Sequence, residues 1–66
     1  MKKNNDFFCE WLKSIPFGEY TEKTQQLANY CGVSKVVISF WKSGRTAIKP
    51  AYQRLIEDFA GKKIFN

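Results

Sequence analysis

Apolar side chains recur every three or four residues in four stretches of this 66-residue chain, which predicts four amphipathic helices. The first helix is expected to start at a cap on Asn5 or Asp6, because either side chain can accept a hydrogen bond from a backbone N–H of the first turn. It is expected to end near Ser14 or Ile15, because Pro16 disfavours the helical conformation in the residue before it. The positions predicted to face inward are Phe8, Trp11, Leu12 and Ile15.

The second predicted helix starts at a cap on Thr21 or Thr24 and runs to about Tyr30. Gly32 follows it and can adopt the positive φ that often ends a helix. Only residues 31–33 separate this helix from the next, and two short helices joined by so tight a turn cross at a steep angle. The inward positions of the second helix are Thr24, Leu27, Ala28 and Cys31.

The third predicted helix, about 34–43, has two contrasting faces, with Ser34 as its cap and Gly44 as its end. One face gathers the apolar residues expected in a core, namely Val37, Ile38 and Trp41. The opposite face holds Lys35, Val36, Ser39, Phe40 and Ser43. A face that met only water would more often carry Glu, Lys and Gln. Val36 and Phe40 therefore indicate a surface that contacts a partner.

The fourth predicted helix begins at Lys49-Pro50, with proline at its tolerated first position, and ends at Gly61. Its apolar stripe is Tyr52, Leu55, Ile56 and Phe59, and its polar face is Gln53, Arg54, Glu57 and Asp58. Residues 1–5 and 62–66 are expected to be flexible, which leaves Ile64 and Phe65 without obvious cover. The whole chain, 1–66, is thus predicted to be one all-α domain.

The net charge of +5 is unevenly distributed along the chain. No carboxylate occurs between residues 23 and 54, whereas six cations do: Lys23, Lys35, Lys42, Arg45, Lys49 and Arg54. A basic middle between acidic flanks favours a polyanionic partner, and nucleic acid more than a membrane.

Several functional classes have little support in the sequence. Cys9 and Cys31 lie 22 residues apart in a chain without histidine, so a metal site is not expected, and Cys31 is predicted to be a core residue and Cys9 a free thiol. No apolar run approaches the ~20 residues of a membrane span, and no apolar segment of a signal peptide follows the N-terminal lysines, so we expect a cytoplasmic protein. Because no nucleophile lies beside a plausible base, catalysis, a cofactor and a small-molecule ligand are not expected.

Two runs of sequence, 24–34 (TQQLANYCGVS) and 38–45 (ISFWKSGR), carry a set of features in register. They are a Leu-Ala pair, a Gly-Val-Ser turn, an Ile-Ser step, a Trp and a Gly-Arg. This combination resembles the helix-turn-helix of the Cro and lambdoid phage repressor family, and residues 48–57 are similar to the helix that follows the motif in small Cro-like proteins. The resemblance implies a compact domain of four to five helices with its motif at 24–45.

The resemblance further implies that the helix at 34–43 enters the major groove of DNA. The implied base-reading positions are Lys35, Val36, Ser39 and Phe40. Lysine can donate to guanine O6 and N7, while valine and phenylalanine can pack on thymine methyl groups. The positions implied to touch the DNA backbone are Thr24, Gln25, Lys42, Ser43, Arg45 and Lys49. Thr24 stands where the family often has glutamine, and Phe40 where it usually has a polar or basic residue.

These expectations describe a sequence-specific transcriptional regulator, a phage- or prophage-type Cro-like repressor that binds a palindromic operator in double-stranded DNA. One motif reads few base pairs, so a homodimer is expected, with contacts from Phe59, Ile64 and Phe65. Two alternatives remain open. One is a protein-interaction module, such as an antitoxin or an inhibitor of a host protein, that uses Val36 and Phe40. The other is an architectural or directionality factor of DNA recombination.

Overall fold

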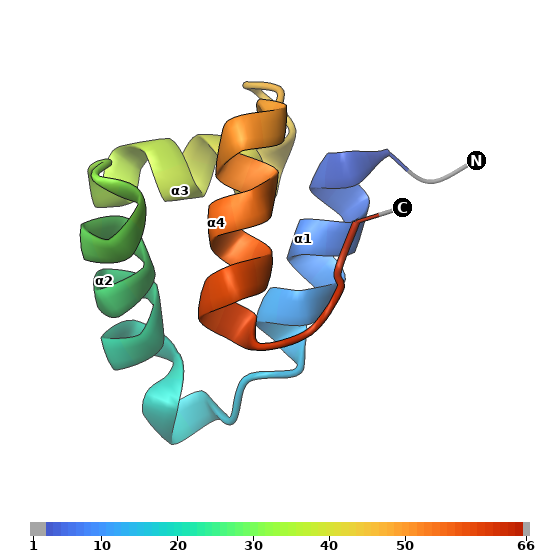
Figure 1. Ribbon diagram of the computed structural model, residues 1–66. Helices are drawn as coiled ribbons and strands as arrows, with labels where there is room; N and C mark the ends of the chain where they lie inside the picture. The colour runs from blue at the N-terminus through green and yellow to red at the C-terminus, as the bar shows by residue number, and fades with distance from the viewer. Residues whose placement is uncertain (1–2, 66) are drawn as a thin grey trace.

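The computed structural model describes residues 3–65 and is all-helical over that range, as the periodicity predicted (Figure 1). A single turn of 3₁₀ helix, η1, lies between the first two α-helices. The elements in chain order are α1 (Asn4–Lys13), η1 (Phe17–Glu19), α2 (Tyr20–Cys31), α3 (Lys35–Ser43) and α4 (Pro50–Ala60).

The helix α3 crosses the direction of α2 and α4, which run side by side (Figure 1). It packs against α2 on one side and against α1 on the other. The steep turn between α2 and α3 is made by Gly32, whose φ of 72° lies in the left-handed region that favours glycine. The sequence therefore places α3 at one end of the molecule, with only its inner face against the core.

Trp41 of α3 lies at the centre of the core with 1% of its surface exposed. The centroid of its ring lies 5.9 Å from that of Phe8 in α1, in an edge-to-face arrangement, and 5.2 Å from that of Tyr52 in α4. Aromatic pairs at these separations bury large apolar areas, which a domain this small needs for stability. The buried apolar residues are Phe8, Leu12, Leu27, Ala28, Cys31, Ile38, Trp41, Ile48, Ile56 and Phe65.

Both cysteines are free thiols. Cys31 is buried, as predicted, and desolvation raises the pKa of its thiol. Cys9 is half-buried.

The predicted start of the first helix was wrong by two or three residues. Lys3 is the residue before the first turn, and its backbone N–H donates to the carboxylate of Asp6 over 3.0 Å. Asn5 lies inside α1, where its side-chain amide donates to the backbone carbonyls of Trp41, over 2.8 Å, and Thr46, over 3.0 Å. Asn5 therefore fixes α1 to the end of α3 instead of capping its own helix.

The predicted start of the second helix was also wrong. The chain between Pro16 and Tyr20 folds as η1 and leads directly into α2, so Thr21 and Thr24 lie within the helix. The hydroxyl of Thr24 donates to the backbone carbonyls of Tyr20 and Thr21. A threonine bonded backward in this way satisfies a helix carbonyl and does not cap an N–H.

The last described residues are held by α4. Oε2 of Glu57 accepts hydrogen bonds from the backbone N–H groups of Ile64, over 2.9 Å, and Phe65, over 3.0 Å. Phe65 is only 3% exposed and belongs to the core. Ile64 and Phe65, which were expected to lack cover, are therefore packed against the core, and Asn4 and Asn5 of the other end expected to be flexible belong to α1. Residues 1, 2 and 66 lie outside the described range. The polar face predicted for α4 is not wholly exposed to water. Gln53 and Glu57 are half-buried, and the Gln53 side chain donates to the carbonyl of Ile48.

Candidate nucleic-acid interface

The ends of α3 are set by the two residues that the sequence indicated. The hydroxyl of Ser34 accepts a hydrogen bond from the backbone N–H of Val37, and Gly44 ends the helix at a φ of 80°. Ile38 and Trp41 are buried on the inner face. The cap, the glycine and the buried pair together fix which residues of α3 face outward.

The four predicted base-reading residues share the outer part of α3, although their exposure differs. Lys35 and Ser39 are exposed, and Val36 has 58% of its surface exposed despite being apolar. Phe40 is half-buried. The guanidinium carbon of Arg45 lies 5.4 Å from the centroid of its ring, close enough for a cation–π interaction. Phe40 is therefore covered in part by the loop after α3.

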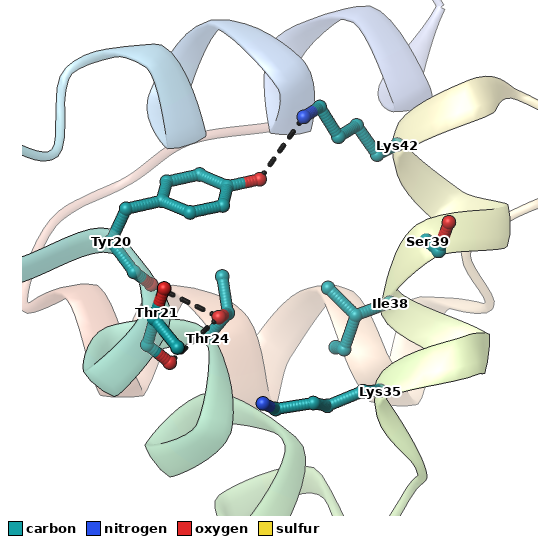
Figure 2. Close-up of a pocket in the computed structure, with 7 residues that line it drawn as sticks. All are labelled: Tyr20, Thr21, Thr24, Lys35, Ile38, Ser39 and Lys42. Carbon is teal, nitrogen blue, oxygen red and sulfur yellow. Dashed lines mark hydrogen bonds between the residues drawn. The ribbon is translucent and has the colours of Figure 1, made fainter. Parts of the chain in front are cut away.

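An open hollow of about 260 Å³ lies between the start of α2 and α3 (Figure 2). Lys35 and Lys42 extend from α3 toward α2 on either side of Ile38, which lies between them (Figure 2). The lining residues are Tyr20, Thr21, Thr24, Lys35, Ile38, Ser39 and Lys42. The hollow thus combines two cations with hydroxyl groups, and none of its lining residues is acidic.

Lys42 is held across this hollow by Tyr20. Its Nζ donates to the Tyr20 hydroxyl oxygen over 3.1 Å and lies 5.2 Å from the centroid of the tyrosine ring. This hydrogen bond, with the electrostatic effect of the phenol, raises the pKa of Lys42 above its ordinary value. The ammonium group is therefore charged at neutral pH.

The structure brings together only some of the residues predicted to touch a DNA backbone. Thr24 and Lys42 line the hollow together with the base-reading candidates Lys35 and Ser39. Gln25, Ser43, Arg45 and Lys49 are exposed but do not line it.

Two predicted backbone contacts have their hydroxyl hydrogens already engaged. The Thr24 hydroxyl donates within α2, and the Ser43 hydroxyl donates to the carbonyl of Phe40 over 3.2 Å. A phosphate offers only acceptors to a hydroxyl group, so neither side chain can donate to it in this arrangement. Thr24 is also half-buried, with its hydroxyl directed along its own helix, whereas Ser43 is exposed.

Tyr20 and Thr21 belong to this site but were not among the site residues predicted from the sequence. Tyr20 precedes the start predicted for the second helix at Thr21 or Thr24, so the periodicity of that helix gave no direction for its side chain. Its position as the first residue of α2 points its ring toward α3 (Figure 2). Only the meeting of Tyr20 with Lys42, 22 residues later, reveals its place in the hollow.

Three comparisons with known proteins give no match: no family model, no curated protein and no solved structure resembles the chain significantly. Within residues 3–65 there is also no group of three or more His, Cys, Asp or Glu side chains able to hold a metal ion. No helix in that range is long and apolar enough to cross a membrane.

Proposed function

We propose that the protein is a sequence-specific DNA-binding regulator that inserts the outer face of α3 into the major groove. The observation that carries this proposal is the division of α3. Ile38 and Trp41 anchor its inner face in the core, and Lys35, Val36 and Ser39 stand exposed on the other side. The basic hollow beside them would lie next to a DNA backbone.

The dimensions of α3 suit this role. An α-helix such as α3 is about 10–12 Å across with its side chains. A B-DNA major groove is ~12 Å wide and admits one α-helix. The stretch without carboxylates, 23–54, includes α3 and most of α2, so repulsion of phosphates by acidic side chains is low on this part of the chain.

The proposed biological role is that of a small Cro-like phage or prophage repressor acting on DNA in the cytoplasm. The support is the resemblance of residues 24–45 to the helix-turn-helix of that family. Because one such motif reads few base pairs, we propose a homodimer on two half-sites about 34 Å apart. Of the three dimer contacts predicted from the sequence, Phe65 is buried within its own subunit. The half-buried Phe59 and Ile64 remain as the proposed dimer contacts.

Selection of preferred sites from random duplex DNA tests the proposal. We expect an enriched palindromic sequence, with each half-site read by one copy of α3. Lys35→Ala should relax the preference at one base pair of each half-site, since a good side-chain contact to a base contributes ~1–3 kcal/mol of discrimination. Lys62→Ala, which removes an exposed lysine far along the chain from α3, serves as the charge-matched control. Recovery of no preferred sequence, or unchanged preferences in Lys35→Ala, would contradict the role assigned to α3.

A second candidate function is a protein-interaction site on the same face, as in an antitoxin or an inhibitor of a host protein. The exposure of Val36 favours it. This apolar side chain is 58% exposed, and a protein surface could cover it as well as DNA could. Val36→Glu should then abolish capture of that partner. Tight DNA binding with a defined site preference would count against this alternative.

A further inference from the structure

The contact between Tyr20 and Lys42 leaves hydrogen-bond donors free at the edge of the hollow. Lys42 donates one hydrogen to the phenolic oxygen over 3.1 Å. An ammonium group has three hydrogens and a phenol has one, so two remain on Lys42 and the hydrogen of Tyr20 is also available. The pair therefore presents donors from two different helices to whatever enters the hollow.

We propose that this hollow binds one phosphodiester group of the DNA backbone, with Tyr20 and Lys42 acting together as a phosphate clamp. The inference rests on the proposed function and adds to it a specific backbone contact and a positioning residue, Tyr20. An anionic ligand is indicated because Lys35 enters the same hollow from its other side (Figure 2). Charge-assisted hydrogen bonds to a phosphate are about twice as strong as those between neutral groups.

The other walls of the hollow fit a phosphate as well. Thr21 and Ser39 are exposed hydroxyl residues on opposite sides, and the apolar Ile38 lies between the two lysines. The volume of the hollow, about 260 Å³, is several times the ~30 Å³ that one water molecule takes up in the liquid. Thr24 contributes no donor, because its hydroxyl hydrogen is directed at carbonyls of α2.

The position of the hollow favours a DNA phosphate over a free anion. Lys35 and Ser39 belong both to its lining and to the outward residues of α3. A duplex that places its bases against that face would carry its sugar–phosphate backbone past the hollow. The phosphodiester would then be delivered by the same contact that reads the bases.

Tyr20 acts by holding Lys42 in place before DNA arrives. A lysine side chain loses considerable rotamer freedom when it is fixed, and this loss weakens binding if it occurs on association. The hydrogen bond and the ring contact at 5.2 Å already restrict Lys42 in the free protein. Removal of the Tyr20 hydroxyl should therefore weaken DNA binding although the net charge is unchanged.

The test compares Lys42→Gln, Tyr20→Phe and the control Lys62→Gln, using fluorescence anisotropy with a short duplex over a range of salt concentrations. Circular dichroism first establishes that each variant is folded. For Lys42→Gln we expect the negative slope of log K against log salt concentration to become shallower by about 0.9 per subunit. Binding to all sequences should weaken alike. For Tyr20→Phe we expect a loss of affinity of about threefold to tenfold, as for the loss of one hydrogen bond. For Lys62→Gln we expect a slope close to that of the unaltered protein.

The failure of this inference is distinguishable from failure of the proposed function. Equal slopes for Lys42→Gln and Lys62→Gln, with Tyr20→Phe unaffected, would overturn the clamp while DNA binding stands. No binding of the unaltered protein to any duplex would overturn both. A titration with inorganic phosphate, followed by NMR at the Tyr20, Thr21 and Ser39 amides, separates the two sources of anion. Saturation by millimolar phosphate without displacement by DNA would overturn the assignment to a backbone phosphodiester.

Discussion

The guanidinium carbon of Arg45 lies 5.4 Å from the centroid of the Phe40 ring. This contact joins the loop after α3 to the outer side of the helix, where an aromatic ring would otherwise face water. Cation–π pairs at exposed sites contribute about 0.5–1 kcal/mol. The conformation of the loop and the presentation of Phe40 are therefore linked.

We expect this link to be measurable in a double-mutant cycle of Phe40→Leu and Arg45→Gln. Leucine retains apolar bulk but lacks the π face, and glutamine retains length but lacks the charge. Urea unfolding of the two single variants and the double variant should give a coupling free energy of about 0.5–1 kcal/mol. Additive effects of the two substitutions would show that the two side chains lie together without interacting.

Asn5→Ala should destabilise the fold more than any other substitution of a polar residue in the first turn of α1. It removes the amide that donates to the carbonyls of Trp41 and Thr46, and the loss of two such hydrogen bonds costs about 1–3 kcal/mol. Urea unfolding measures the change in the free energy of unfolding. Asn4→Ala is the matched control, because the Asn4 side chain makes neither of these bonds, and equal losses in the two variants would contradict the anchoring role.

Glu57 should make the stability of the domain depend on pH. Hydrogen bonds from the backbone N–H groups of Ile64 and Phe65 lower the pKa of the Glu57 carboxyl below its ordinary value of 4.5. A carboxyl whose pKa is lower in the folded state contributes stability above its unfolded pKa, and the contribution is lost as the pH falls through the folded pKa.

We therefore expect Glu57→Gln to be less stable than the unaltered protein at pH 7, by about 1 kcal/mol, because contact with water weakens bonds to a charged group. The difference should shrink below about pH 4 as the carboxylate is protonated. Urea unfolding at pH 7 and pH 3 measures it. The neighbouring exposed carboxylate gives the control, Asp58→Asn, and a pH-independent difference for Glu57→Gln would refute the mechanism.

Ser34 allows the stability of α3 to be separated from its proposed contact with DNA. Ser34→Ala removes the cap and should lower the free energy of unfolding by about 1 kcal/mol with little change in affinity per folded molecule. Ser34→Asp retains a capping side chain but places a negative charge at the start of α3. It should be as stable as the unaltered protein and bind duplex DNA at least tenfold more weakly, because phosphates repel it. Undiminished affinity in Ser34→Asp would place the DNA elsewhere.

The helix boundaries that the sequence predicted best are those with local causes. Ser34 and Gly44 delimit α3, and Pro50 and Gly61 delimit α4, because each acts on backbone groups a few residues away. The inward faces of α2 and α3 also agree with the apolar periodicity.

Two of the predictions that failed depend on contacts with other parts of the chain. The side-chain amide of Asn5 donates to Trp41, which is 36 positions later in the chain, and to Thr46, which is 41 positions later. This tertiary contact overrode its preference for capping a helix. Phe65 is held in the core by the hydrogen bonds from the backbone N–H groups of Ile64 and Phe65 to Glu57. The periodicity of apolar residues does not predict hydrogen bonds of this kind. For the candidate site, the outward residues of α3 followed from the pattern, whereas the hollow depended on the meeting of Tyr20 and Lys42.

The division of α3 has a consequence for how the protein can change over generations. Ile38 and Trp41 hold the helix in register with the core, whereas Lys35, Val36 and Ser39 touch little of their own chain. Substitutions at these three outward positions should change folding free energy by no more than about 0.5 kcal/mol. Mutation can therefore change the outward surface of α3 nearly independently of fold stability and without repacking the interior.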